Sequence, residues 1–243
     1  MISKKYLLKL ISITLILFTI LSALVILFFK QMPLGSSVYD LLNRNEPVHD
    51  YEHALKILST YPKVSHSNLP LSVRHKTDVN FQGKFYLIPK NDVYKKICLN
   101  NRINSLMSKE DQLCNYYIND SGKCLVFIND KLLKTFFDLV GILDIKKYNS
   151  VSLKITSAYR STYRNDRVGG APQSQHLKGK ALDLHIGDIN KDGKANQADK
   201  VIVYDILDKE IIKDKGGLGF YPGTMIIHMD VRGSRARWNN YSR

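Results

Sequence analysis

The sequence predicts an α+β protein: a small antiparallel sheet flanked by helices, preceded by one N-terminal transmembrane helix. Three observations predict this. Apolar and polar residues alternate, as in half-buried strands, at 151–155, 181–186 and 225–231. Apolar residues recur at helical spacing at 131–143 and 198–212. An uncharged apolar stretch covers 10–29, and about 20 such residues can span a bilayer.

The N-terminal segment predicts the compartment. Lys4, Lys5 and Lys9 precede or open the apolar stretch, and such a basic flank stays on the cytoplasmic side. No small-residue cleavage pattern follows the stretch, which favours an uncleaved anchor over a cleaved signal peptide. We therefore expect residues 1–30 to form a cytoplasmic tip and a single-pass anchor in the cytoplasmic membrane. The C-terminal part would face the outer side, periplasmic or extracellular.

Three further parts are expected beyond the anchor. They are a linker or juxtamembrane segment at 31–80, the N-terminal part of the extracytoplasmic domain at 81–150, and a core at 151–243 that carries the candidate site described below. Within the first two parts, the patterns predict a helix at 50–58, a loop at 61–80, a strand at 81–88 and helices at 97–107 and 131–143. In the core, residues 216–222 are expected to be a turn-rich entry to the last strand.

The charge of the chain limits its partners. The net charge is +14, which favours polyanionic surroundings such as anionic lipid or acidic wall polymers. No nucleic-acid-binding module is recognisable and the lysines are spread along the chain, so no nucleic-acid partner is expected. Most of the basic residues are assigned to a solvated surface.

The three cysteines leave the disulfide pattern open. In an exported protein, one pair can be oxidised. Cys114 can pair with Cys124, which encloses a short polar loop, or equally with Cys98, and one thiol is then left over. Three free thiols are the alternative.

Two histidines and one aspartate have the spacing of a metal site. His176 and Asp183 form a His-x6-Asp motif, and His228 follows 45 residues later. Two imidazoles and a carboxylate make a three-ligand zinc set with an open fourth position, which distinguishes a catalytic from a structural site. Asp183 and His228 lie in alternating segments, so we expect two strands to direct a ligand to the same side of a sheet. The sequence therefore predicts a catalytic zinc ion on these residues.

Arg160 is a candidate for substrate chemistry. It follows the strand predicted at 151–155. A guanidinium presents a fixed fork of donors that suits a developing oxyanion or a substrate carboxylate. The alternative for Arg160 is a surface salt bridge, which would contribute little energy.

Asp230 and His185 are candidates for proton transfer. Each lies two residues from a zinc ligand on its own strand and therefore on the same face. Either could be a general base or a group that orients a ligand. Asp230 is the favoured catalytic partner, and the alternative for it is a structural carboxylate paired with Arg232 or Arg235.

Several motifs occur in order over residues 151–240. They are SAYRS at 157–161, VGGAPQSQH at 168–176, GKALD at 179–183, GLGFYP at 217–222, HMDVRG at 228–233 and RW at 237–238. Together they resemble the zinc D-Ala-D-Ala carboxypeptidase and murein endopeptidase family. The resemblance implies a small α+β domain with an antiparallel sheet, zinc on His176, Asp183 and His228, and peptidoglycan peptides as the substrate.

The chain departs from the family pattern at the general base. Some members place a glutamate three residues before the last ligand, and others a histidine two before it. Met225 and Ile226 occupy these positions here, and neither can accept a proton. Two hypotheses follow: a membrane-anchored peptidase that cuts stem peptides or cross-links of peptidoglycan, and a catalytically silent, zinc-containing domain for wall binding or interaction.

Residues 188–199 have the spacing of a calcium loop. Oxygen-bearing side chains fall at loop positions 1, 3, 5, 9 and 12 and glycine at position 6, as in the EF-hand, where position 7 offers a carbonyl. Aspartate at position 12 resembles the dockerin variant. The expected ligands are Asp188, Asn190, Asp192, the carbonyl of Lys194, Asn196 and Asp199. A polar turn is the alternative; a bound calcium ion would be structural.

Overall fold

The computed structural model describes residues 51–69, 84–107 and 123–239. They lie within one compact unit, Pro47–Arg243. The expected anchor at 10–29 and most of the expected linker lie outside the described residues. Among the helices that are described, none is long and apolar enough to cross a membrane.

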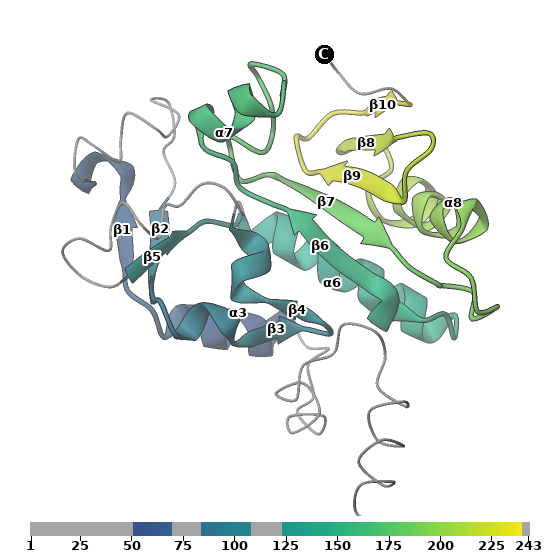
Figure 1. Cartoon of the computed structure of the whole chain (residues 1–243), viewed down its shortest axis with the longest axis horizontal. Helices are drawn as coiled ribbons and strands as arrows, with labels where there is room; N and C mark the ends of the chain where they lie inside the picture. Colours follow the sequence, from purple (N-terminus) through teal and green to yellow (C-terminus); the bar gives the residue numbers. More distant parts are fainter. Residues whose placement is uncertain (1–50, 70–83, 108–122, 240–243) are drawn as a thin grey trace, which may run out of the picture. The chain divides into compact units, whose positions relative to one another are not determined.

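A five-stranded sheet forms the centre of the C-terminal part (Figure 1). Its strand order is β10-β8-β9-β7-β6, and neighbouring strands are antiparallel except for the edge strand β10, which runs parallel to β8. The strands are β6 Leu153–Ser157, β7 Ala181–Ile186, β8 Gly217–Phe220, β9 Ile226–Asp230 and β10 Ala236–Trp238.

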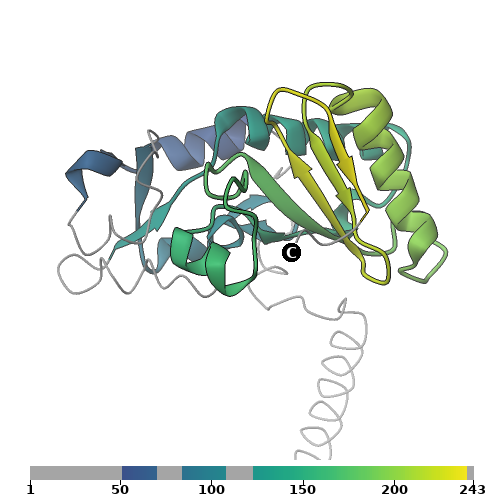
Figure 2. The same cartoon turned by 90° about the horizontal axis from the view of Figure 1, so that it is seen from above.

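Helices cover one face of this sheet and one side of it (Figures 1 and 2). The described helices of this unit are α3 Tyr51–Ser59, α6 Asp130–Ile145, α7 Thr162–Arg167 and α8 Gln197–Ile206, and α8 continues into a π-helical turn, η5 Leu207–Ile211. The N-terminus of α6 is capped by Asn129, whose side chain accepts a hydrogen bond from the amide of Leu132. The apolar side chains of α6 share one core with β6, β7 and β9.

The central strands separate a core face from a polar face. Leu182 and Leu184 on β7, and Ile227 and Met229 on β9, are fully buried in the core. The alternate residues point to the opposite face because side chains alternate along a strand. On that face, Asp183 of β7 lies directly opposite His228 of β9 in the antiparallel register.

Shorter strands precede the central sheet. Three of them form an antiparallel sheet in the order β1-β2-β5: β1 Lys63–Ser65, β2 Lys84–Pro89 and β5 Lys123–Val126. A two-stranded ladder joins β3 Lys96–Cys98 to β4 Asn101–Arg102. Short 3-10 turns lie at η1 His66–Asn68, η2 Asp92–Tyr94, η3 Ile103–Leu106 and η4 Ser150–Ser152. Residues on both sides of position 150 share one hydrophobic core.

The structure confirms most of the predicted elements. The helices expected at 50–58, 131–143 and 198–212 correspond to α3, α6 and α8 with η5. The strands expected at 81–88, 151–155, 181–186 and 225–231 correspond to β2, β6, β7 and β9. Strand β1 lies within the segment expected to be a loop, and β8 lies within the segment expected to be a turn-rich entry.

The helix predicted at 97–107 is wrong. The segment forms β3, β4 and η3, with a turn at Leu99 in which φ is +52°. Tertiary hydrogen bonds explain the difference. The buried side chain of Asn101 accepts from the amide of Ile155 at 2.7 Å and donates to the carbonyl of Leu153 at 3.2 Å, so it pairs with β6. These contacts outweigh a weak helical periodicity.

The structure excludes one of the two disulfide pairings that the sequence left open. Cys98 is a free, buried thiol, and Cys124 is disulfide-bonded. The pairing through Cys98 is therefore not formed, and Cys114 lies outside the described residues. Burial raises the pKa of Cys98 to about 12, so this thiol stays protonated at neutral pH.

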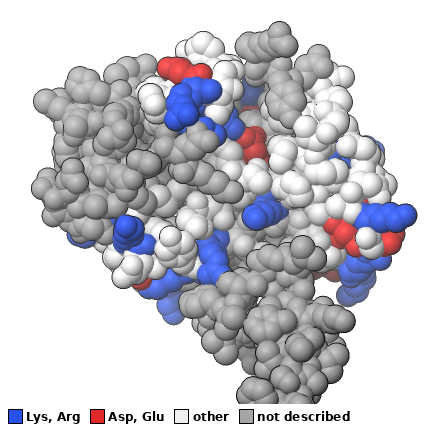
Figure 3. Space-filling view, in the orientation of Figure 1, with Lys and Arg blue, Asp and Glu red and all other residues white. Residues whose placement is uncertain are grey.

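Basic side chains do not form one continuous band on the face shown in Figure 3, where Lys and Arg of the described residues appear as separate spots. This distribution is the one expected for basic residues on a solvated surface.

Candidate metal centre

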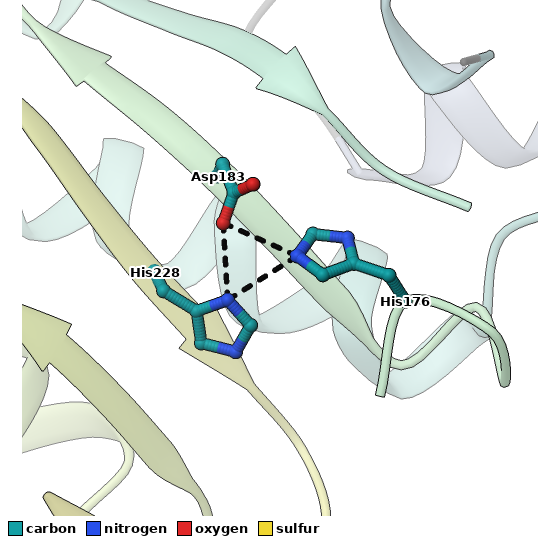
Figure 4. Close-up of side chains that lie close together, drawn as sticks. All are labelled: His176, Asp183 and His228. Carbon is teal, nitrogen blue, oxygen red and sulfur yellow. Dashed lines mark hydrogen bonds and ion pairs between the residues drawn. The ribbon is translucent and has the colours of Figure 1, made fainter. Parts of the chain in front are cut away.

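His176, Asp183 and His228 come together on the polar face of the sheet (Figure 4). Nε2 of His176 lies 3.2 Å from Oδ1 of Asp183 and 3.2 Å from Nδ1 of His228, and the last two atoms are 3.0 Å apart. Only 2%, 9% and 6% of the respective surfaces are exposed, so the cluster is shielded yet reaches solvent. In the described part of the chain, these residues are the only group of three or more histidine, cysteine or acidic side chains whose donor atoms lie close enough together to hold a metal ion.

The donor atoms fit a zinc ion. Ligands at about 2.0–2.1 Å from a tetrahedral ion lie about 3.3 Å from one another, close to the spacing of these atoms. Two ring nitrogens and one carboxylate oxygen are also the donor types that zinc prefers. Three protein ligands leave one tetrahedral position for another molecule. The three predicted ligands are thus assembled as a catalytic zinc site requires.

The loop that carries His176 is fixed by its backbone. Nδ1 of His176 bonds to the carbonyl oxygen of Ala158, which leaves Nε2 facing the other two ligands. The carbonyl of His176 accepts from the amides of Arg160 and Gly179, both at 3.1 Å. Gly179 has φ of +60°, and a Cβ there would lie 2.0 Å from the ring of Phe127, so only glycine fits.

His228 is held from behind by Asp230. Nε2 of His228 lies 3.1 Å from Oδ2 of Asp230, which turns Nδ1 toward the other ligands. Asp230 is fully buried. Its carboxylate also accepts from the guanidinium of Arg232, at 2.6 Å and 2.9 Å, and from the amide of Gly217 at 3.0 Å. These contacts favour the orienting role, one of the two considered for Asp230. They include the pairing with Arg232 that was named as the alternative to a catalytic role.

Arg160 contacts the carboxylate of a predicted ligand. Its Nη2 donates to Oδ2 of Asp183, and its Nε donates to Oγ of Ser157 at 3.0 Å. Since Nη2 takes Oδ2, Oδ1 of Asp183 is the oxygen that faces the two histidines. The ion pair is largely buried, so it is not the surface salt bridge considered as an alternative.

The electrostatics of the cluster favour bound positive charge. Burial alone would raise the pKa of Asp183, but the two neighbouring histidines outweigh it and hold that pKa well below its ordinary value. Burial lowers the pKa of His176, which keeps it neutral as a ligand must be. Burial also opposes the charged form of His228, but Asp183 and Asp230 outweigh it and raise its pKa. The two carboxylates thus attract a cation.

His185 is the third predicted catalytic residue. It lies on β7, two residues beyond Asp183 on the same face, and pairs across the sheet with Ile226. In contrast to the ligands, it is exposed. The structure therefore places an imidazole at the open end of the polar face, where its role in proton transfer stays a prediction.

Sequence reasoning missed an aromatic wall beside His228. The ring of Trp238 lies 5.0 Å from the ring of His228, and its Nε1 donates to Oη of Tyr221 at 3.4 Å. Trp238 sits on Gly219, where a Cβ would lie 2.6 Å from Nε1. The spacing of Gly217 and Gly219 was the available signal, because two glycines on one strand face leave room for other side chains.

In the predicted calcium loop, the aspartate carboxylates accept hydrogen bonds from backbone amides of the loop itself. Asp188 accepts from the amides of Asp192 and Gly193 at 3.1 Å and 3.0 Å, and Gly193 has φ of +86°. Asp199 is buried and accepts from the amides of Ile189, Asn190 and Asn196, and with Asn196 it forms the capping box of α8. The three loop aspartates are not gathered into a group like that of the zinc ligands.

The C-terminal part of the chain is similar to a known family of proteins. Residues 133–230 match the family model described as Peptidase M15. Relatives include the peptidoglycan L,D-endopeptidase MepK of Escherichia coli (strain K12) and that of Shigella flexneri, each 26% identical over 113 residues, which cover 44% of this chain and 53% of the relative. The chain thus spans about half the length of the curated relatives it matches.

If Asp230 orients His228, Asp230→Asn should lower zinc affinity by about 10- to 100-fold, the usual cost of losing such a partner. A competition titration with a chromogenic chelator measures this. Asp214→Asn removes a carboxylate that is 83% exposed and should leave the affinity unchanged. Unchanged zinc affinity in Asp230→Asn, together with a loss of turnover, would instead indicate a general base.

Proposed function

We propose that this protein is a zinc peptidase of the M15 type that hydrolyses peptide bonds in peptidoglycan, because residues 133–230 match the family model described as Peptidase M15 and carry the motifs of that family. The substrates would be stem peptides or cross-links. One observation carries the proposal: the donor atoms of His176, Asp183 and His228 form a triangle. Three protein ligands would leave the fourth position of a tetrahedral zinc ion open. The relatives named as L,D-endopeptidases make L,D bonds the first substrates to test.

In the proposed hydrolysis, the residues of the site have separate roles. Zinc held by the three ligands would supply a Lewis acid for the scissile carbonyl and would lower the pKa of a water molecule. Asp230 keeps the His228 ring in the tautomer and orientation that a ligand needs. Arg160 holds Asp183 in place, and its guanidinium can also donate to the oxyanion that develops on the substrate.

His185 is our candidate for proton transfer. Because it is exposed on the ligand face, a substrate lying along β7 can reach it. His185→Gln should lower kcat by about 10²- to 10⁴-fold, the usual contribution of a general acid or base, while zinc content stays constant. An unchanged kcat would exclude this role.

A catalytically silent wall-binding domain is the second candidate. Position 225 is a methionine and position 226 an isoleucine, so no proton acceptor stands at either. Such a domain would retain zinc and bind muropeptides without cleaving them. Incubation of the zinc-loaded chain with muropeptides distinguishes the two functions.

We also propose that the chain is anchored in the cytoplasmic membrane with the zinc domain on its outer side. The basic N-terminus and the apolar stretch at 10–29 support this arrangement. The peptidoglycan that the enzyme would cut lies on that side.

Calcium is proposed as a second, structural ion. The spacing of oxygen-bearing residues over 188–199 supports it, as do the left-handed residues Lys191 and Gly193, which bend the loop around its carboxylates. The loop connects β7, which carries Asp183, to α8. A bound ion would stiffen this connection.

The full-length chain in mild detergent, supplied with zinc and a set of muropeptides containing L,D and D,D bonds, should release new peptides detectable by mass spectrometry. His176→Ala, Asp183→Ala and His228→Ala should each lose roughly a hundredfold or more in rate and lose bound zinc, since even outer partners of a ligand cost about 10- to 100-fold. Lys209→Ala, on an exposed part of η5, is the matched control. A zinc-loaded chain that binds muropeptides without cleaving any of them would establish the silent domain instead.

Calcium at about 10 mM should raise the melting temperature by about 5–10 °C if Kd is near 10⁻⁴ M, because a ligand at a hundredfold excess over Kd stabilises by about 2.7 kcal/mol. Differential scanning calorimetry measures the shift. Asp188→Ala should abolish it and keep zinc content, while Asp214→Ala, outside the loop, should keep it. No shift in the wild-type chain reduces the loop to a polar turn.

After cell fractionation, the full-length protein should sediment with membranes, and external protease should degrade its C-terminal part. Replacing three residues of the apolar stretch by lysine should release it from the membrane, because charged residues at the centre of a span are costly. A soluble product with a trimmed N-terminus in the wild type would show a cleaved signal peptide.

A further inference from the structure

Lys200 is a buried cation that donates hydrogen bonds to the neighbouring turn at 221–224. Its side chain is fully buried on α8, directly after the calcium loop. Its Nζ donates to the carbonyl oxygens of Tyr221 at 2.6 Å and Thr224 at 2.8 Å, and lies 4.1 Å from the centroid of the Phe220 ring. Among the described residues, no ion pair to a carboxylate is formed by Lys200. Burial lowers its pKa, as expected for a desolvated ammonium group.

Such a lysine is costly to maintain. Removing an ammonium group from water carries a large penalty, which carbonyl oxygens and an aromatic face only partly offset. An apolar side chain of similar length would fill the same space without that penalty. The specific property of lysine at this position is therefore its set of donors, which tie α8 to the turn at 221–224.

The turn at 221–224 leads from β8 into β9 and carries an aromatic residue of the wall. Gly217 and Gly219 pair with Asp230 and His228 on the polar face, and Tyr221 follows at the next alternate position. Its Oη accepts from Nε1 of Trp238, and the Trp238 ring lies 5.0 Å from that of His228. Two contacts thus connect the turn to a zinc ligand.

We propose that Lys200 is a positioning residue of the zinc site. By fixing the turn at 221–224, it sets the hydroxyl of Tyr221 against Nε1 of Trp238 and so holds the Trp238 ring beside His228. The peptide substrate would lie along this ring. The kinetic part of this inference rests on the proposed peptidase function. The structural part does not, because it concerns the placement of Trp238 alone.

The chain contains one tryptophan, so its intrinsic fluorescence reports on Trp238 directly. Lys200→Met in the full-length protein should shift the emission of Trp238 to the red in the folded state, because the ring loses its Tyr221 partner and gains water. Lys200→Arg, which keeps a cation with several donors, should restore part of the wild-type spectrum. Lys209→Met is the matched control, since Lys209 is an exposed lysine of η5 that pairs with Asp205.

With muropeptides, Lys200→Met should lose roughly tenfold to a hundredfold in kcat/KM at unchanged zinc content, as expected for a displacement of about 1 Å near the reacting groups. Wild-type fluorescence and kinetics in a folded Lys200→Met variant would overturn the proposal, even if its melting temperature changed. If this variant does not fold, Lys200→Leu, which also lacks a donor, takes its place under the same criteria. If the wild type cleaves nothing, the proposed function fails, and the fluorescence comparison still decides the role of Lys200.

Discussion

The arrangement of side chains on the polar face depends on the contacts of the buried carboxylate of Asp230. It joins the ring of His228, the guanidinium of Arg232 and the amide of Gly217, and so connects β9, the turn after it and β8. A buried charge is tolerated only when its oxygens are fully paired, so these partners are required together. Gly217 follows from the same constraint, since a Cβ there would lie 2.2 Å from Oδ2 of Asp230. The tautomer of His228, and hence the atom it offers to a metal, is set by this arrangement.

The sequence predicts the elements whose own residues decide their conformation. The long periodic helix α6 and the alternating strands β7 and β9 are of this kind. Short elements that depend on distant partners were not predicted. Residues 97–107 have apolar residues at helical spacing, yet Asn101 pairs with the backbone of β6, more than 50 positions away. Strand β8 contains two glycines, which disfavour a strand, and forms because Asp230 and Trp238 occupy the space that side chains would fill.

The candidate site was predictable as far as chemistry and spacing determine it. Two histidines and an aspartate are a zinc set in any fold, and strand alternation places Asp183 and His228 on one face. The sequence did not decide whether Asp230 is a general base or a group that orients a ligand. The answer depends on which nitrogen of His228 faces the other two predicted ligands, and only the three-dimensional arrangement determines this. The wall formed by Tyr221 and Trp238 and the buried Lys200 depend on side-chain contacts between separate elements, for which sequence spacing carries no signal.

The wide separation of the three ligands along the chain has a consequence for folding. His228 reaches Asp183 only after the intervening 44 residues, including α8 and β8, have formed, and such non-local pairing comes late in folding. The unfolded chain offers single histidines and carboxylates that bind metals weakly and with little selectivity. If the site binds zinc as proposed, the choice among metal ions is made by a sheet that is already assembled, and the zinc available in the compartment where folding finishes would decide which chains acquire it.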